Sequence, residues 1–119
     1  MATLADPAFQ ARLAALNAKF GASIAATLAS MQAERALCGN ALPAASGMQQ
    51  LHVILHTVAG SAATFGFPVF GQQARRLDNA LRLMLEQRPI PAQQWAAWLA
   101  EFDVFLAWVA ADPQAATYP

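Results

Sequence analysis

The stretch LHVILHTVAGSAATFGFP, residues 51–68, contains the features that decide the fold. Its apolar residues recur at steps of three and four, which is the spacing that places them on one face of a helix. Gly66 is typical of a helix end, and Pro68 is typical of the first turn of the helix that follows. The stretch therefore predicts two consecutive helices joined by a tight turn, over residues 46–65 and 68–88.

The sequence before this pair predicts a long first helix, over residues 7–37. Asp6 followed by Pro7 is typical of an N-cap and a first helical residue, because proline fixes φ where its missing N–H costs nothing. Apolar residues at helical spacing are expected to line its inner face: Phe9, Leu13, Leu16, Phe20, Ile24, Leu28 and Met31. Breakers that lie close together predict a loop before the Ser46 N-cap of the second helix: Gly39, Asn40 and Pro43.

The sequence after the pair predicts a fourth helix, over residues 91–111, which begins after two closely spaced prolines. This helix carries a broad apolar stripe that is more typical of a core than of an aromatic binding surface: Trp95, Trp98, Leu99, Phe102, Phe105, Leu106 and Val109. Short connections between amphipathic helices favour antiparallel neighbours. We therefore expect one all-α domain over residues 1–119, an up-down four-helix bundle, with residues 112–119 as a frayed tail.

The charge balance excludes several classes of protein. Seven basic and seven acidic residues cancel, so there is no overall positive field to hold a nucleic acid or an anionic membrane. The most apolar segment is interrupted by Glu101 and Asp103, and the first residues lack the basic and apolar regions of a signal peptide. We expect a soluble cytoplasmic protein, in which the single cysteine, Cys38, forms no internal disulfide.

One face of the second helix is not explained by packing. A helical wheel with His56 as reference places the apolar residues on the opposite side, so His56 is expected to project outward. His52, Ala59, Gly60 and Ala63 lie within about 60° of it on the wheel. Glycine within a helix costs about 1 kcal/mol relative to alanine, so Gly60 needs a reason, and access of another macromolecule to the imidazole is one.

The run HTVAGSAATFG, residues 56–66, resembles the pattern H-x-L-K-G-S-x-x-x-x-G of the histidine-phosphotransfer (HPt) domain family. Four residues match at the family spacing: His56, Gly60, Ser61 and Gly66. Val58 is conservative at the apolar position, whereas the family's common lysine is replaced by Ala59. The resemblance covers the two middle helices closely and the outer two only by length and helical character.

The resemblance implies that His56 accepts a phosphoryl group from an aspartyl phosphate on a receiver domain and passes it to another receiver in a multistep phosphorelay. A neutral imidazole suits this role because it is nucleophilic near neutral pH. The chain would bind no cofactor, since the receiver supplies Mg²⁺ and a lysine. The expected partners are response-regulator receiver domains, a hybrid sensor kinase or both, and the chain is expected to be a monomer.

The resemblance also implies a polar residue on the third helix that bonds the other imidazole nitrogen. Asp78 is the position that aligns with it and Gln73 is the alternative, while a solvated position for Asp78 is an equally open interpretation. The residues expected to contact a partner are His52, Ala59, Gly60, Ala63, Phe67 and Arg76. Phe67 could instead tuck under the turn, and Arg75 and Arg76 are the cations available to an acidic receiver surface.

Two other functions remain open at this stage. His52 and His56 are four residues apart, so their side chains meet on a helix and could take two positions of a zinc or copper site. A second alternative is an adaptor that binds a receiver or a kinase through the same face without being phosphorylated. The retained His56 argues against an adaptor, whereas Ala59 in place of lysine favours it mildly.

Overall fold

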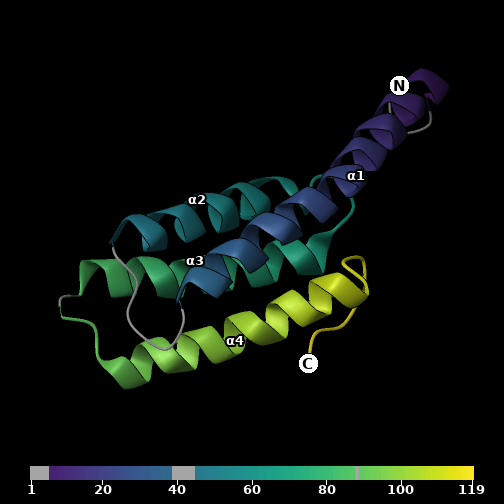
Figure 1. Ribbon diagram of the computed structural model, residues 1–119. Coiled ribbons are helices and arrows are strands. Elements are labelled where there is room, and N and C mark those ends of the chain that lie inside the picture. The colour runs from purple at the N-terminus through teal and green to yellow at the C-terminus, as the bar shows by residue number, and fades with distance from the viewer. Residues whose placement is uncertain (1–5, 39–44, 88) are drawn as a thin grey trace.

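The computed structural model describes residues 6–38, 45–87 and 89–119, and the described part folds into four helices with no strand. Figure 1 shows them antiparallel and in chain order: α1 (Pro7–Cys38), α2 (Ala45–Ser61), α3 (Pro68–Glu86) and α4 (Ala92–Ala111). Each helix packs against the next, and α4 packs back against α1. The all-α up-down bundle is therefore confirmed. None of the described helices has the length and apolarity needed to cross a membrane.

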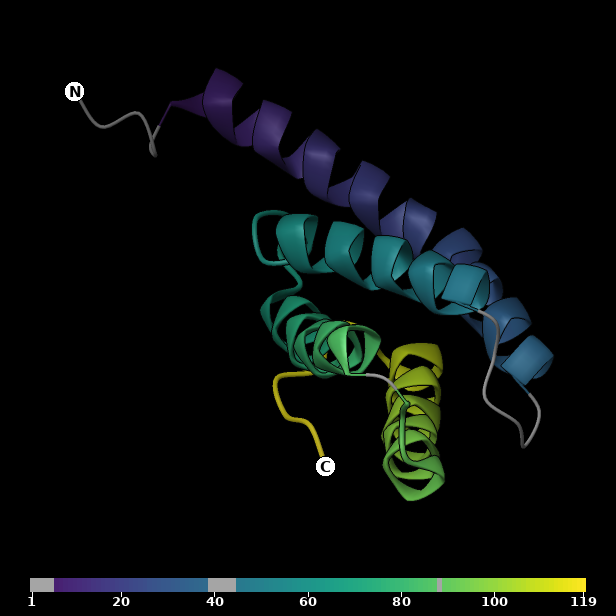
Figure 2. The same ribbon diagram turned by 90° about the vertical axis from the view of Figure 1, so that its left-hand side faces the viewer.

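Helix α1 starts as its sequence predicts. The Asp6 carboxylate accepts a hydrogen bond of 3.0 Å from the backbone N–H of Ala8, which satisfies one of the free donors at the helix start. The N-terminal end of α1 projects beyond the other helices (Figures 1 and 2). Ile24 and Met31, further along, are buried, but Leu16 is 49% exposed. The N-terminal part of the expected inner face therefore lies beyond the core. The prediction that Leu16 belongs to a buried face is wrong.

The connection between α2 and α3 is a tight turn over residues 62–66, so α2 ends earlier than the expected Phe65. The backbone N–H of Phe67 donates to the carbonyl of Ala62 at 2.8 Å, which closes the turn. Gly66 has a φ of +93°, a conformation that other residues adopt only with strain. Gly66 therefore takes the left-handed conformation expected of a helix cap, but at the end of the turn that follows α2, and Pro68 is the first residue of α3.

The other helix ends lie within two residues of the expected ones, and α4 ends at the expected Ala111. Helix α2 begins at Ala45, so Ser46 lies inside its first turn and is not its N-cap. Helix α3 ends at Glu86, two residues before the expected end, and Pro91 caps α4 from an extended conformation instead of starting it. The expected loop residues lie outside the described residues: Gly39, Asn40 and Pro43.

The core lies along α4 and the sides of the other helices that face it. Most of the apolar stripe of α4 is buried, as predicted, and its rings follow one another along the helix: Trp95, Trp98, Phe102, Phe105 and Trp108. The indole N–H of Trp98 donates to the carbonyl of Leu77 at 3.0 Å, so this buried donor is satisfied by α3. The α3–α4 interface is thereby fixed in register.

Residues 112–119 are docked against the bundle, and the expectation of a frayed tail is wrong. The indole N–H of Trp108 donates to the carbonyl of Thr117 at 2.9 Å, and the Tyr118 ring lies edge-on to the Trp108 ring at 5.5 Å. The Gln114 amide donates to the carbonyl of Gly66 at 3.3 Å. The tail is held because Trp108 needs an acceptor and Tyr118 offers an aromatic partner.

Candidate functional site

His56 stands on the outward side of α2, in the C-terminal half of the helix. Its side chain is 75% exposed, whereas Leu51, Leu55 and Val58 of the same helix are buried. A Cβ atom added to Gly60, one turn later, would meet nothing within 4 Å, and Ala63 is exposed. The imidazole is therefore open to approach from solvent, as the wheel predicts.

Asp78 of α3 lies beneath this imidazole and is only 3% exposed, so the interpretation of a solvated carboxylate is wrong. One carboxylate oxygen, Oδ1, is 2.6 Å from Nδ1 of His52. The other, Oδ2, is 3.7 Å from Nδ1 of His56 and 3.6 Å from Nε of Arg82. A buried carboxylate requires such partners, because desolvation disfavours an isolated charge. Asp78 therefore lies near the imidazole of His56, but its hydrogen bond goes to His52.

A hollow of about 240 Å³ opens beside His56 between α2 and α3. Its lining residues come from both helices: His56, Ala59, Gly60, Arg75, Asp78, Asn79 and Arg82. Two of them are cations and one is an anion, so the hollow carries a net positive charge when His56 is neutral. The face around His56 thus differs in charge from the balanced chain as a whole.

Ala59 does not belong to the exposed patch expected around His56. It is 8% exposed and packs towards α3, and its backbone carbonyl accepts a hydrogen bond of 3.3 Å from Nη2 of Arg75. A helical wheel of α2 alone cannot show where the neighbouring helix packs. Helix α3 covers the side of α2 that carries Ala59, so the prediction that Ala59 is exposed is wrong. Gly60 and Ala63 are exposed, and their contact with a partner remains a prediction.

Phe67 is also absent from the exposed face, because it tucks under the turn, which was the alternative interpretation. It is 6% exposed, and its ring lies 5.3 Å from the ring of Phe20 on α1. A Cβ atom on Gly21 would stand 3.3 Å from this ring, so Gly21 leaves the space that the ring fills. Phe67 therefore holds α1 against the turn.

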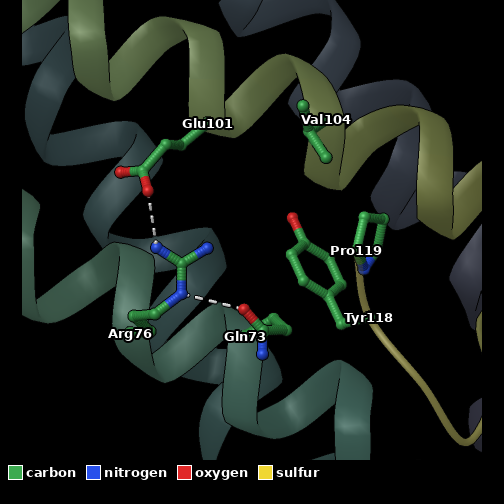
Figure 3. Close-up of a pocket in the computed structure, with 6 residues that line it drawn as sticks. All are labelled: Gln73, Arg76, Glu101, Val104, Tyr118 and Pro119. Carbon is green, nitrogen blue, oxygen red and sulfur yellow. Dashed lines mark hydrogen bonds and ion pairs between the residues drawn. The ribbon is translucent and has the colours of Figure 1, made fainter.

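Arg76 and Gln73 face a second hollow, of about 550 Å³, between α3, α4 and the tail (Figure 3). Nε of Arg76 donates to Oε1 of Gln73 at 2.8 Å, and Nη1 donates to Oε1 of Glu101 at 3.1 Å. The guanidinium carbon also lies 5.9 Å from the centre of the Tyr118 ring. Neither residue lines the hollow of His56, so Arg76 is wrongly assigned to that face and Gln73 is not the residue beside the imidazole.

Sequence reasoning missed Asn79 and Arg82 as neighbours of His56. Arg75 and Arg82 stand three residues before and four residues after Asp78, which places all three on one face of α3. This spacing is the sequence signal from which Arg82 could have been placed near His56.

Within the described residues, no group of three or more His, Cys, Asp and Glu side chains is arranged to hold a metal ion.

Four antiparallel helices that expose the imidazole of His56 above a buried carboxylate define a small helical module with one accessible histidine. A family model described as the Hpt domain matches residues 22–108, well over half of the chain, and the chain belongs to this family. The resemblance seen in residues 56–66 is confirmed. Comparison with curated proteins and with solved structures gave no match. Membership implies histidine phosphotransfer in phosphorelays, and Hpt domains typically interact with receiver domains.

Proposed function

We propose that Nε2 of His56 is the phosphoryl acceptor of a cytoplasmic multistep phosphorelay. The observation that carries the proposal is an imidazole that is 75% exposed and has Nδ1 within 3.7 Å of the buried Asp78 carboxylate. The two ring nitrogens lie on different edges of the imidazole, so Nε2 is left for an incoming group. A proton on Nδ1, favoured by the carboxylate, leaves the lone pair on Nε2.

The transfer needs little from this chain beyond a positioned nucleophile. Nε2 attacks the phosphorus of a receiver's aspartyl phosphate, a P–N bond forms, the P–O bond to aspartate breaks, and the carboxylate leaves with the electron pair. The positive charge that develops on the ring is offset by Asp78 below it. Delivery to a second receiver reverses these bond changes. The buried position of Asp78 makes this compensation stronger than that of a solvated carboxylate.

The groups that this chain lacks would come from its partner. A receiver domain would bring Mg²⁺ and a lysine to the oxygens of the transferring group, and the exposed imidazole of His56 at the hollow is open to the approach of such a domain. Receivers, a hybrid sensor kinase or both would dock on the side of α2 that carries His56, Gly60 and Ala63. The chain would act as a monomer.

The test is phosphoryl transfer from a panel of the host's phosphorylated receiver domains. We expect phosphate on the wild-type chain that is labile to acid and stable to base, as for a P–N bond, and none on His56→Gln. His52→Gln is the matched control, because it removes a histidine one turn earlier, and it should still be labelled. Receiver binding without such phosphate on the wild type would establish the adaptor function instead.

A further inference from the structure

The hollow beside His56 holds more positive charge than the sequence motif indicates. Arg75 and Arg82 of α3 both line it, with Asp78 as its carboxylate. Arg75 and Arg82 are seven residues apart, close to two helical turns, so both guanidinium groups reach the same side of the bundle. The motif within α2 offers no cation there, because Ala59 occupies the position of the family's lysine.

The charge of Arg82 already has partners within the chain. Its Nε lies 3.6 Å from Oδ2 of Asp78, and its Nη2 donates to Oδ1 of Asn79 on the same helix. A carboxylate at this distance offsets much of the field that the guanidinium would exert on an incoming anion. Arg82 therefore mainly compensates the buried Asp78.

Arg75 differs from Arg82 in that no carboxylate is paired with it in the described part of the chain. Its hydrogen bond there goes from Nη2 to the neutral carbonyl of Ala59 at 3.3 Å. A guanidinium has five N–H donors, so this bond fixes the group at the rim of the hollow and leaves donors for another acceptor. An uncompensated cation held beside an exposed nucleophile is suited to binding an anion.

Building on the proposed function, we propose that Arg75 binds the phosphoryl oxygens carried by His56. It supplies from α3 the positive charge that the family's lysine would supply from α2. Ala59 permits this arrangement because it is small and buried, and its carbonyl holds the guanidinium in place. Arg75 thus acts as a phosphoryl-binding residue of this site, in contrast to Arg76, which serves the α3–α4 interface.

The contribution of Arg75 to phosphorylation of His56 can be measured without a receiver. Phosphoramidate is a small donor that transfers its phosphoryl group to imidazole and releases ammonia. The full chain and its Arg75→Gln, Arg75→Lys and Arg76→Gln variants are compared for the rate of phosphohistidine formation, followed by ³¹P NMR. Charge-assisted hydrogen bonds at partly exposed sites lead us to expect a fall of about 3- to 10-fold for Arg75→Gln. Arg75→Lys should recover part of the rate, and Arg76→Gln should stay within about twofold of wild type.

The salt dependence separates a binding role from a structural one. The wild-type rate should fall with ionic strength more steeply than the rate of Arg75→Gln, because the variant lacks the attraction that salt screens. Equal rates and equal salt slopes for wild type and Arg75→Gln would overturn the assignment, and so would an equal loss in Arg76→Gln. Wild-type chain that is labelled neither by phosphoramidate nor by any receiver would instead overturn the proposed function of His56.

Discussion

At the scale of single residues, the site is built around one buried carboxylate. Asp78 is shared between two histidines, yet its distance to His52 is 2.6 Å and its distance to His56 is 3.7 Å. His52 therefore serves mainly to satisfy Asp78, and only a quarter of its side chain is exposed. The two histidines of α2 therefore differ in their surroundings, because His52 is the closest partner of the carboxylate whereas the imidazole of His56 is open to solvent.

Replacing His52 should therefore destabilise the fold more than replacing His56. We expect His52→Leu to lower the free energy of unfolding by about 1–3 kcal/mol, because it leaves a buried carboxylate without its closest partner. His52→Asn should lose less, since its amide N–H can still donate to Asp78. Urea denaturation measures these values, with His56→Leu as the control. An equal loss in both leucine variants would contradict the unequal sharing of Asp78.

A second residue-scale prediction concerns alkaline pH. Burial raises the pKa of the Cys38 thiol above its ordinary value of 9.0, and burial likewise raises the pKa of Tyr118 above 10.0. The folded chain therefore holds these protons to higher pH than the unfolded chain does, so the stability they contribute is complete below the unfolded pKa values and is lost as pH rises through the folded ones.

The measurement is the free energy of unfolding from about pH 8 to pH 11. We expect wild type to lose stability over this range, and a Cys38→Ala/Tyr118→Phe double variant to show a flatter profile. A profile that is equally steep in both proteins would show that other groups control alkaline unfolding.

At the scale of the elements, capping and helix-breaking residues determine where helices begin and end. The Asp6 cap, Pro68 at the start of α3 and the positive φ of Gly66 follow from chemistry that is local to each residue, so the sequence predicts them. The placements of Ala59 and Phe67 could not be predicted in this way. They depend on which flank of α2 meets α3 and on how α1 crosses the turn, and neither is encoded in the periodicity of one helix.

Two glycines of the motif should respond in opposite ways to alanine. Gly66→Ala should cost about 1–2 kcal/mol of stability, because its φ of +93° is strained for any residue with a Cβ atom. Gly60→Ala should be neutral or stabilising by up to about 1 kcal/mol, because Gly60 is helical and a Cβ there meets nothing within 4 Å. Thermal unfolding of the two variants tests this, and a Gly60→Ala protein less stable than wild type would contradict it.

At the scale of the whole molecule, the backbones of the four helices approach each other in a closed ring, from α1 to α2 to α3 to α4 and back to α1. The closing contact between α1 and α4 contains a bidentate ion pair, in which Arg35 donates to both oxygens of Asp103 at 2.7 and 3.0 Å. Met31, one turn before Arg35 on α1, is fully buried in the core. The bundle thus combines a surface ion pair with core packing.

The ion pair of Arg35 and the burial of Met31 should differ severalfold in their contributions to the free energy of unfolding. Arg35→Ala should cost about 1 kcal/mol or less, because the pair is partly solvated, with 26% and 50% of its side chains exposed. Met31→Ala, one turn earlier, should cost about 2–5 kcal/mol through lost burial and the cavity left behind. Denaturant unfolding at low and high salt distinguishes them, since only the Arg35 contribution should shrink with salt. A larger loss for Arg35→Ala would show that electrostatics dominates closure.

The position of the tryptophans has a spectroscopic consequence. All three lie on α4, whose backbone does not come close to that of α2 within the described residues. Intrinsic emission should therefore report unfolding of the core, while events at the imidazole on the far side of the ring should leave it nearly unchanged. A real-time assay at His56 calls for a separate reporter, such as a fluorophore on a cysteine introduced at the exposed Ala63, where the buried Cys38 would compete little for the label.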